Sequence, residues 1–147
     1  MVILERINRS FYHMMALVQR RSWSSKEQFM LSDYLSVEDI IFIQEDHRDA
    51  AIKTLVDHLC LHKPGIHQQR FFEAVISREK IVSTGIGNGV AIPHAKLDDL
   101  NDFVLAIGIH KHEGIDWNSL DDMPVKVIFL IGGPSLDQKK YLKILSH

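Results

Sequence analysis

One ten-residue stretch decides how this chain is interpreted: Gly85-Ile86-Gly87-Asn88-Gly89-Val90-Ala91-Ile92-Pro93-His94. It places a histidine just after a short apolar β segment, behind a loop with three glycines. Glycine allows positive φ and a close approach to the backbone, and Pro93 fixes its own φ and donates no hydrogen bond. A rigid histidine at the exposed end of a strand suits group transfer, because a pKa of about 6.5 leaves much of the imidazole neutral and nucleophilic at pH 7.

Five further segments accompany this stretch in a fixed order: Leu31-Ser32-Asp33-Tyr34-Leu35, Ser77-Arg78-Glu79-Lys80, Ser83-Thr84-Gly85, Gly114-Ile115-Asp116-Trp117 and Pro124-Val125-Lys126-Val127-Ile128-Phe129-Leu130. The ordered set resembles the fructose/mannitol-type (type 2) enzyme IIA domains of the bacterial phosphotransferase system, including the nitrogen-regulatory enzyme IIA proteins. The resemblance runs from about Met30 to His147. It implies an α/β (α+β) fold in which a mixed β-sheet is flanked by helices.

The bulk properties indicate one cytoplasmic domain. The 147 residues carry a net charge of −2, which implies no general affinity for nucleic acid. No apolar run is long enough to span a membrane, and polar residues interrupt any signal-peptide core at the N-terminus. The single Cys60 excludes an intrachain disulfide and fits a reducing compartment.

Residues 1–29 differ from the domain proposed for residues 30–147. They are rich in arginine, and their apolar residues can form a loose helical stripe. This pattern allows an amphipathic arm for a membrane surface or a partner. We favour the alternative, a poorly ordered extension or one that arises from an upstream start codon.

Two helices and several strands are expected between these motifs. Asp46 is predicted to cap a helix with Asp49 in its first turn, and Lys63-Pro64-Gly65 ends that helix. Its apolar residues at helical spacing are Ile52, Leu55, Val56 and Leu59. A second helix, from about His67 to Glu79, is expected to bury Phe71, Phe72, Val75 and Ile76.

The strands are expected as apolar runs. Residues 38–44 contain a buried strand, and Phe103–Ile109 and Val125–Ile131 read as central strands covered on both faces. A last helix is expected from Asp137 to His147. Because helices alternate with strands, these elements predict a mixed sheet with helices packed on it.

Phosphoryl transfer needs a nucleophile and a group that neutralises the phosphoryl oxygens. The resemblance implies that His94 becomes a phosphohistidine and that Arg78, sixteen residues upstream, binds phosphate through its planar fork. Without the resemblance, His94 would be a structural strand-end histidine and Arg78 a solvated cation favoured by the helix dipole.

Glycine-rich turns form concavities that bind anions. We therefore expect phosphate contacts from the Thr84 hydroxyl and from backbone N–H groups at Gly87 and Asn88. The alternative for the glycines is a tight turn only, and both interpretations can hold together.

The family often has a second histidine near the active one, and Tyr141 occupies its place in this chain. A tyrosine can donate a hydrogen bond, but its pKa of about 10 prevents proton shuttling at neutral pH. The replacement of the second histidine by a tyrosine argues against a full phosphorelay through this protein.

Other histidines carry weaker signals. His58 and His62 lie at i and i+4, a spacing that can bind metal, but no third ligand is evident, so we expect no metal site. His110 and His112 follow an apolar run and fit edge or loop positions. Cys60 lies in a helical pattern, unlike the phosphorylated cysteine of an enzyme IIB domain.

The resemblance implies a phosphocarrier that uses no cofactor. His94 would accept a phosphoryl group from phosphorylated HPr, or its nitrogen-branch counterpart, and pass it to an enzyme IIB cysteine in a sugar-uptake chain. The first alternative is a regulatory binding module, in which the state of His94 controls contact with a kinase, channel or transcription factor. The second is a degenerate family member with a structural or interaction role.

Family members usually continue past the helix at Leu142–Ser146, so the domain is expected to be short at its C-terminus. The apolar faces of Phe103–Ile109 and Val125–Ile131 would then have less cover. An uncovered patch of this kind tends to find a partner. We therefore expect either self-association into a homo-oligomer or cover from residues 1–29.

Overall fold

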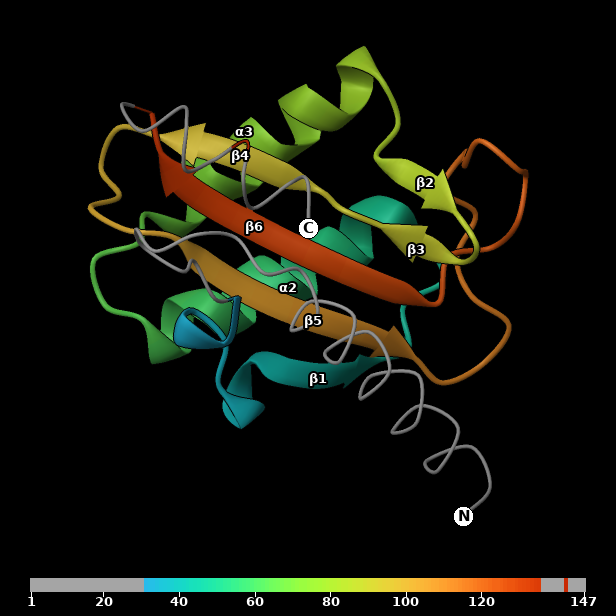
Figure 1. The fold of residues 1–147 in the computed structure, drawn as a ribbon, viewed down its shortest axis with the longest axis horizontal. Helices are drawn as coiled ribbons and strands as arrows, with labels where there is room; N and C mark the ends of the chain where they lie inside the picture. The colour runs from blue at the N-terminus through green and yellow to red at the C-terminus, as the bar shows by residue number, and fades with distance from the viewer. Residues whose placement is uncertain (1–30, 136–141, 143–147) are drawn as a thin grey trace, which may run out of the picture.

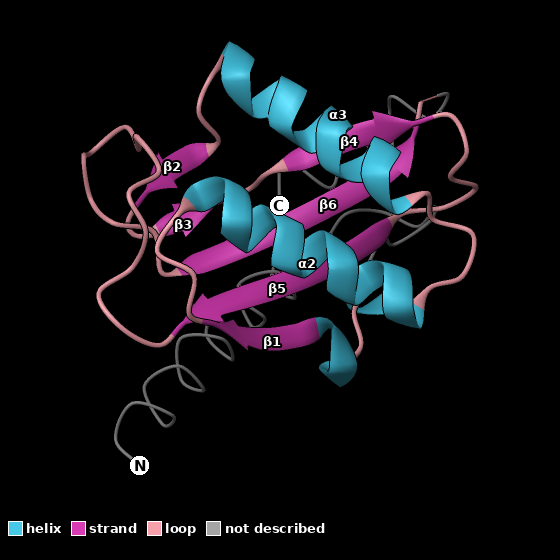
Figure 2. Ribbon diagram, turned by 180° about the vertical axis from the view of Figure 1, so that it is seen from behind, coloured by secondary structure: helices cyan, strands magenta, loops and turns pink. Residues whose placement is uncertain are grey.

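The computed structural model describes residues 31–135 and residue 142. Its elements in chain order are the 3-10 turns η1 (Leu31–Asp33) and η2 (Val37–Asp39), then β1 (Ile40–Ile43), α2 (Arg48–His62), α3 (Gln68–Ile81), β2 (Gly85–Gly87), β3 (Val90–Ala91), β4 (His94–Leu97), β5 (Val104–His110) and β6 (Val127–Pro134). Figures 1 and 2 show one sheet with α2 and α3 on the same face. No helix in this part of the chain is long and apolar enough to cross a lipid bilayer.

The sheet is mixed, as the resemblance and the pattern of elements predict. Its strand order is β1-β5-β6-β3-β2, and β4 also pairs with β6. β1 is parallel to β5, β5 is antiparallel to β6, and both β3 and β4 are parallel to β6. The two apolar runs predicted as central strands correspond to β5 and β6, each with neighbours on both sides.

β3 and β4 share one edge of β6 and are separated by Ile92 and Pro93. Proline gives a sheet no N–H, but the Pro93 carbonyl accepts from the N–H of Ile131 at 3.0 Å. His94 then begins β4 opposite Ile131. The histidine thus follows the short β segment, as expected, but it also starts a strand that the sequence analysis did not predict.

Both helices bury the apolar stripes that define them. In α2 the predicted core positions are fully buried, namely Ile52, Leu55, Val56 and Leu59. In α3 Phe71 and Val75 are fully buried, whereas Phe72 and Ile76 are only partly buried at the margin of the core. The helical spacing therefore identified the correct faces, and it overstated the width of the second one.

Two helix boundaries differ from the prediction. His47, not Asp46, is the N-cap of α2: its backbone is extended (φ −120°, ψ 138°) and its carbonyl accepts the first helical hydrogen bond, from Ala51 at 3.0 Å. Asp49 lies in the first turn, as expected. The second helix continues to Ile81, two residues past the predicted end at Glu79.

Several apolar side chains of β5 and β6 on the other face of the sheet are buried, and the expected choice between self-association and cover from residues 1–29 stays a prediction. Leu105, Ile107 and Ile131 are at most 4% exposed. Tyr34 and Leu35 pack against the cluster of Phe103, Leu105 and Ile131. Residues 1–29, Tyr141 and the predicted last helix apart from Leu142 lie outside the described residues.

Candidate functional site

A hydrogen bond fixes the ring of His94. Nδ1 of His94 lies 2.8 Å from the carbonyl oxygen of Ile92. A carbonyl oxygen can only accept, so Nδ1 carries the proton and Nε2 carries the lone pair of the neutral ring. The acceptor, Ile92, lies in the two-residue interruption between β3 and β4. The backbone conformation of this interruption therefore also determines the tautomer of His94.

The surroundings of His94 favour the neutral ring. The side chain is partly buried, and this burial is the largest cause that lowers the pKa of His94. The positive charge of Arg78 lowers the pKa further, whereas the hydrogen bond to Ile92 and the negative charge of Glu79 oppose the shift without reversing it. The ring is therefore mainly neutral at pH 7, as a nucleophile must be.

Arg78 lies in the last turn of α3 and is partly buried. Its Nη1 donates to the carbonyl of Val82 at 3.0 Å, just beyond the helix end. This contact holds the guanidinium at the end of α3, and its charge acts on His94. The structure therefore brings the predicted arginine and histidine into one electrostatic neighbourhood.

The turn between β2 and β3 binds a carboxylate of the protein, where a phosphate was expected. Gly87 and Asn88 both have positive φ, 93° and 54°, which confirms a tight turn. The N–H of Asn88 donates to Oδ2 of Asp121 at 2.8 Å. The turn holds a carboxylate of the chain itself, and the Asn88 N–H cannot serve a phosphoryl oxygen at the same time.

The hydroxyl and the N–H of Thr84 also form hydrogen bonds within the protein. Its hydroxyl donates to Oε2 of Glu79 at 2.6 Å, and its N–H donates to Oε1 of the same carboxylate at 2.8 Å. The indole Nε1–H of Trp117 donates to Oε1 of Glu79 at 3.0 Å. Glu79, Thr84 and Trp117 are all buried, so the Thr84 hydroxyl belongs to a buried network rather than to a surface phosphate site.

The sequence alone predicts no role for Glu79 or Trp117 in the site. A signal for Glu79 was present, because Phe71, Val75 and Glu79 are spaced by four residues and so share the buried face of α3. The partner could not be found in this way, because Trp117 is 38 residues further along the chain.

The remaining candidates lie away from this network or outside the described part of the chain. The rings of His58 and His62 have centroids 4.6 Å apart, and Nε2 of His58 is hydrogen-bonded to the Glu38 carbonyl. Residues 31–135 contain no group of three side chains that could bind a metal. Burial raises the pKa of the Cys60 thiol on α2. Tyr141 is not placed.

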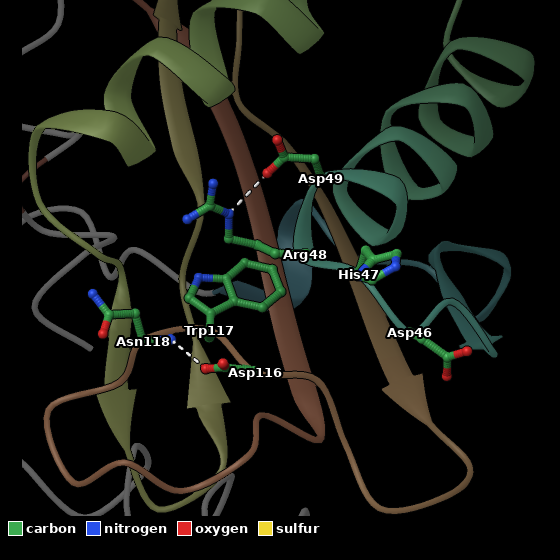
Figure 3. Close-up of a pocket in the computed structure, with 7 residues that line it drawn as sticks. All are labelled: Asp46, His47, Arg48, Asp49, Asp116, Trp117 and Asn118. Atoms are coloured by element: carbon green, nitrogen blue, oxygen red, sulfur yellow. Dashed lines mark hydrogen bonds and ion pairs between the residues drawn. The ribbon is translucent and has the colours of Figure 1, made fainter.

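A separate polar depression of about 330 Å³ lies at the start of α2 (Figure 3). Its lining residues are Asp46, His47, Arg48, Asp49, Asp116, Trp117 and Asn118. Within it Arg48 pairs with Asp49 at 2.8 Å, and the N–H of Asn118 donates to Asp116 at 3.0 Å. His94 does not line this depression, and Trp117 belongs both to its wall and to the Glu79 network.

Comparisons with known proteins agree with this fold. A nitrogen regulatory protein of Klebsiella oxytoca is 37% identical over 94 residues, which are 63% of this chain and 57% of that protein. The chain thus spans about half the length of the curated relatives it matches.

Solved structures share the fold. The nitrogen regulatory protein IIA-Ntr of Neisseria meningitidis superposes with a TM-score of 0.73 at 24% identity and covers 79% of both chains. A complex of enzyme IIAMtl with phosphorylated enzyme IIBMtl of Escherichia coli gives a TM-score of 0.63 at 17% identity, over 76% of this chain and 78% of that one. The family described as phosphoenolpyruvate-dependent sugar phosphotransferase system, EIIA 2, matches residues 33–147, and the chain belongs to this family.

Proposed function

We propose that the protein is a phosphocarrier and that Nε2 of His94 accepts the phosphoryl group. The observation that carries the proposal is the hydrogen bond from Nδ1 of His94 to the carbonyl of Ile92. It directs the lone pair to Nε2 of a ring that burial and the charge of Arg78 keep neutral. Membership of the enzyme IIA family supports the same role.

The transfer balances without another reactant. Nε2 attacks the phosphorus of a phosphohistidine on the donor, the donor's P–N bond breaks, and the donor nitrogen keeps that electron pair. The new P–N bond leaves the ring of His94 protonated at Nδ1 and positively charged. The Ile92 carbonyl then accepts from a charged donor, a hydrogen bond stronger than the one in the resting ring. Arg78 supplies positive charge to the phosphoryl oxygens.

The proposed donor is HPr or its nitrogen-branch counterpart, and the proposed acceptor is an enzyme IIB cysteine. The Escherichia coli complex of enzyme IIAMtl with phosphorylated enzyme IIBMtl supports an acceptor of this class, because the two enzyme IIA folds are alike. Thr84 and Asn88 are left out of the phosphate contacts, since their donors are bound to Glu79 and Asp121.

A second candidate function is regulation without sugar transport. It is favoured by the nitrogen regulatory protein of Klebsiella oxytoca, with which 63% of this chain aligns. In that case phosphorylation of His94 would change binding to a target protein, and no enzyme IIB would be needed. Transfer of the phosphoryl group from the labelled protein to an enzyme IIB separates the two functions.

Incubation with phosphoenolpyruvate, enzyme I and HPr tests the proposal. Intact-mass analysis should show one acid-labile phosphoryl group on the protein. The His94→Ala variant should take up none, because the nucleophile is gone. His112→Ala is the matched control, since His112 is exposed on the loop after β5 and should leave labelling unchanged. Equal labelling of His94→Ala and the wild type would refute the assignment.

A further inference from the structure

A chain of hydrogen bonds leads from a buried carboxylate to the ring of His94. Oε1 of Glu79 accepts from the N–H of Thr84 at 2.8 Å. The carbonyl of Thr84 accepts from the N–H of Ile92 at 3.0 Å, and the carbonyl of Ile92 is bonded to Nδ1 of His94 at 2.8 Å. Thr84 and Ile92 are therefore each held at both the N–H and the carbonyl, and the last link holds the ring.

The first member of this chain is itself fixed. Glu79 is 3% exposed, and its two oxygens also accept from the Thr84 hydroxyl and from the indole of Trp117. Among residues 31–135 no cation forms an ion pair with it. Burying a carboxylate costs free energy that hydrogen bonds must offset. Here three neutral donors provide them, so no adjacent cation cancels the charge.

We propose that Glu79 is a positioning residue for His94, an inference that rests on the function proposed above. By fixing Thr84, and through it Ile92, the carboxylate keeps the Ile92 carbonyl at Nδ1 and the lone pair at Nε2. The hydrogen bond at one ring nitrogen decides which nitrogen reacts. For histidines that bind a metal, removing such a supporting partner lowers affinity or activity roughly 10- to 100-fold, and we expect a loss of the same order here.

The charge of Glu79 has a second effect on the same ring. It raises the pKa of His94, against burial and the charge of Arg78, which lower it. After transfer the ring is protonated at Nδ1 and positively charged, whereas the phosphoryl oxygens are negative. Glu79 and Arg78 are neighbours at the end of α3. Glu79 stabilises the charged ring and Arg78 the phosphoryl group, so the two side chains act on opposite charges of the same phosphohistidine.

Two substitutions separate the geometric effect from the charge effect. Glu79→Gln keeps an oxygen that can accept from the Thr84 N–H and from Trp117, and its amide can donate to the Thr84 hydroxyl, so the charge is lost and one hydrogen bond reverses its direction. Glu79→Ala removes the acceptor as well. Glu73→Gln is the matched control, because Glu73 is exposed on α3 and accepts a hydrogen bond from Gln69.

The first measurement is made on the unphosphorylated protein, by nitrogen-15 NMR of the His94 ring. Wild type, Glu73→Gln and Glu79→Gln should all show the proton on Nδ1. Glu79→Ala should show a mixture of the two tautomers. The ring of Glu79→Gln should titrate at lower pH than that of Glu73→Gln. An unchanged tautomer in Glu79→Ala, or equal titration midpoints in Glu79→Gln and Glu73→Gln, would overturn the inference.

Phosphoryl uptake from phosphorylated HPr is the second measurement. Glu79→Ala should be slower than the wild type by roughly 10- to 100-fold, and Glu73→Gln should match the wild type. If Glu79→Ala does not fold, Glu79→Asp takes its place, because the shorter side chain withdraws the carboxylate from the Thr84 N–H and should likewise give a mixture of the two tautomers. The NMR result stays informative if His94 takes up no phosphoryl group, so a failure of the proposed function can be distinguished from a failure of this inference.

Discussion

Two buried carboxylates of this molecule look alike and are compensated differently. Asp39 is 1% exposed and Glu79 is 3% exposed, and each accepts three hydrogen bonds. Asp39 accepts from the N–H and hydroxyl of Ser36 and from Nζ of Lys63, all at 3.0 Å. Glu79 accepts only from uncharged donors, Thr84 and Trp117. The difference is the ammonium group of Lys63.

This difference separates a structural carboxylate from one that influences a reactive group. Lys63 is the C-cap of α2, so its ion pair with Asp39 joins the end of that helix to η2. The charge of Asp39 is neutralised where it lies. The charge of Glu79 is not, and it acts on His94. Burial alone therefore does not show whether an acidic residue is structural or acts on a reactive group. The presence or absence of a positively charged partner distinguishes the two cases.

Asp39→Ala should cause the largest loss of stability. It removes one hydrogen bond from the Ser36 N–H, one from the Ser36 hydroxyl and the ion pair with Lys63, and hydrogen bonds to a charged group are worth about 1.5–3 kcal/mol each. Because Lys63 is partly exposed and can regain water, we expect the free energy of unfolding in urea to fall by about 2–4 kcal/mol. The rate of phosphoryl uptake per folded molecule should stay unchanged.

Asp98→Ala is the control for Asp39→Ala, because Asp98 is exposed in the turn after β4. It should change the free energy of unfolding by no more than about 0.5 kcal/mol. A large fall in uptake by folded Asp39→Ala would remove the contrast between the two carboxylates.

Arg78→Ala should show the opposite pattern. Charge-assisted hydrogen bonds to phosphoryl oxygens are worth about 1.5–3 kcal/mol, so uptake should slow by roughly 10- to 100-fold. Stability should change little, because the contact of Arg78 with the Val82 carbonyl is at an exposed helix end. Arg70→Ala is the control on the same helix, since Arg70 is 60% exposed and lies 3.6 Å from Asp99. Equal rates for the two variants would make Arg78 an ordinary surface cation.

The sequence was sufficient for the elements whose signal is local. Helical spacing identified the buried face of α2, and continuous apolar runs identified β5 and β6. The short strand β4 could not be found in this way, because His94–Leu97 mixes charged and apolar residues and is defined by its pairing with β6. The glycine stretch placed His94 correctly after β3, since glycine and proline restrict the backbone within the stretch itself.

Two expected phosphate contacts are absent because other side chains of the protein bind the same donors. Thr84 and Asn88 were expected to bind phosphate, but Glu79 and Asp121 occupy their donors. The second of these contacts joins residues 33 positions apart. A carboxylate near a helix end is usually exposed, whereas Glu79 lies on the buried face of α3 and accepts a hydrogen bond from Trp117, 38 residues further along the chain. Which side chain binds a given donor is determined by the tertiary structure, so the sequence motif alone does not predict it.

The smallest expected effect is the pH dependence of stability, and it distinguishes the two regions by pH range. Burial, together with the charge of Arg78, lowers the pKa of His94 from its ordinary 6.5. The unfolded chain therefore binds a proton at His94 first as the pH falls, and the folded state loses stability from about pH 6.5 down to the lowered pKa.

For Asp39 burial alone would raise the pKa, but hydrogen bonds from Ser36 and Lys63 outweigh it and lower the pKa below 3.8. The stability that Asp39 contributes is thus lost only at more acidic pH, as its carboxylate is protonated.

In urea unfolding at a series of pH values, His94→Gln should remove the loss of stability that begins near pH 6.5 and leave the loss at lower pH in place. If His94→Gln and wild type lose stability in parallel through the upper range, the ring of His94 is not held neutral by its surroundings.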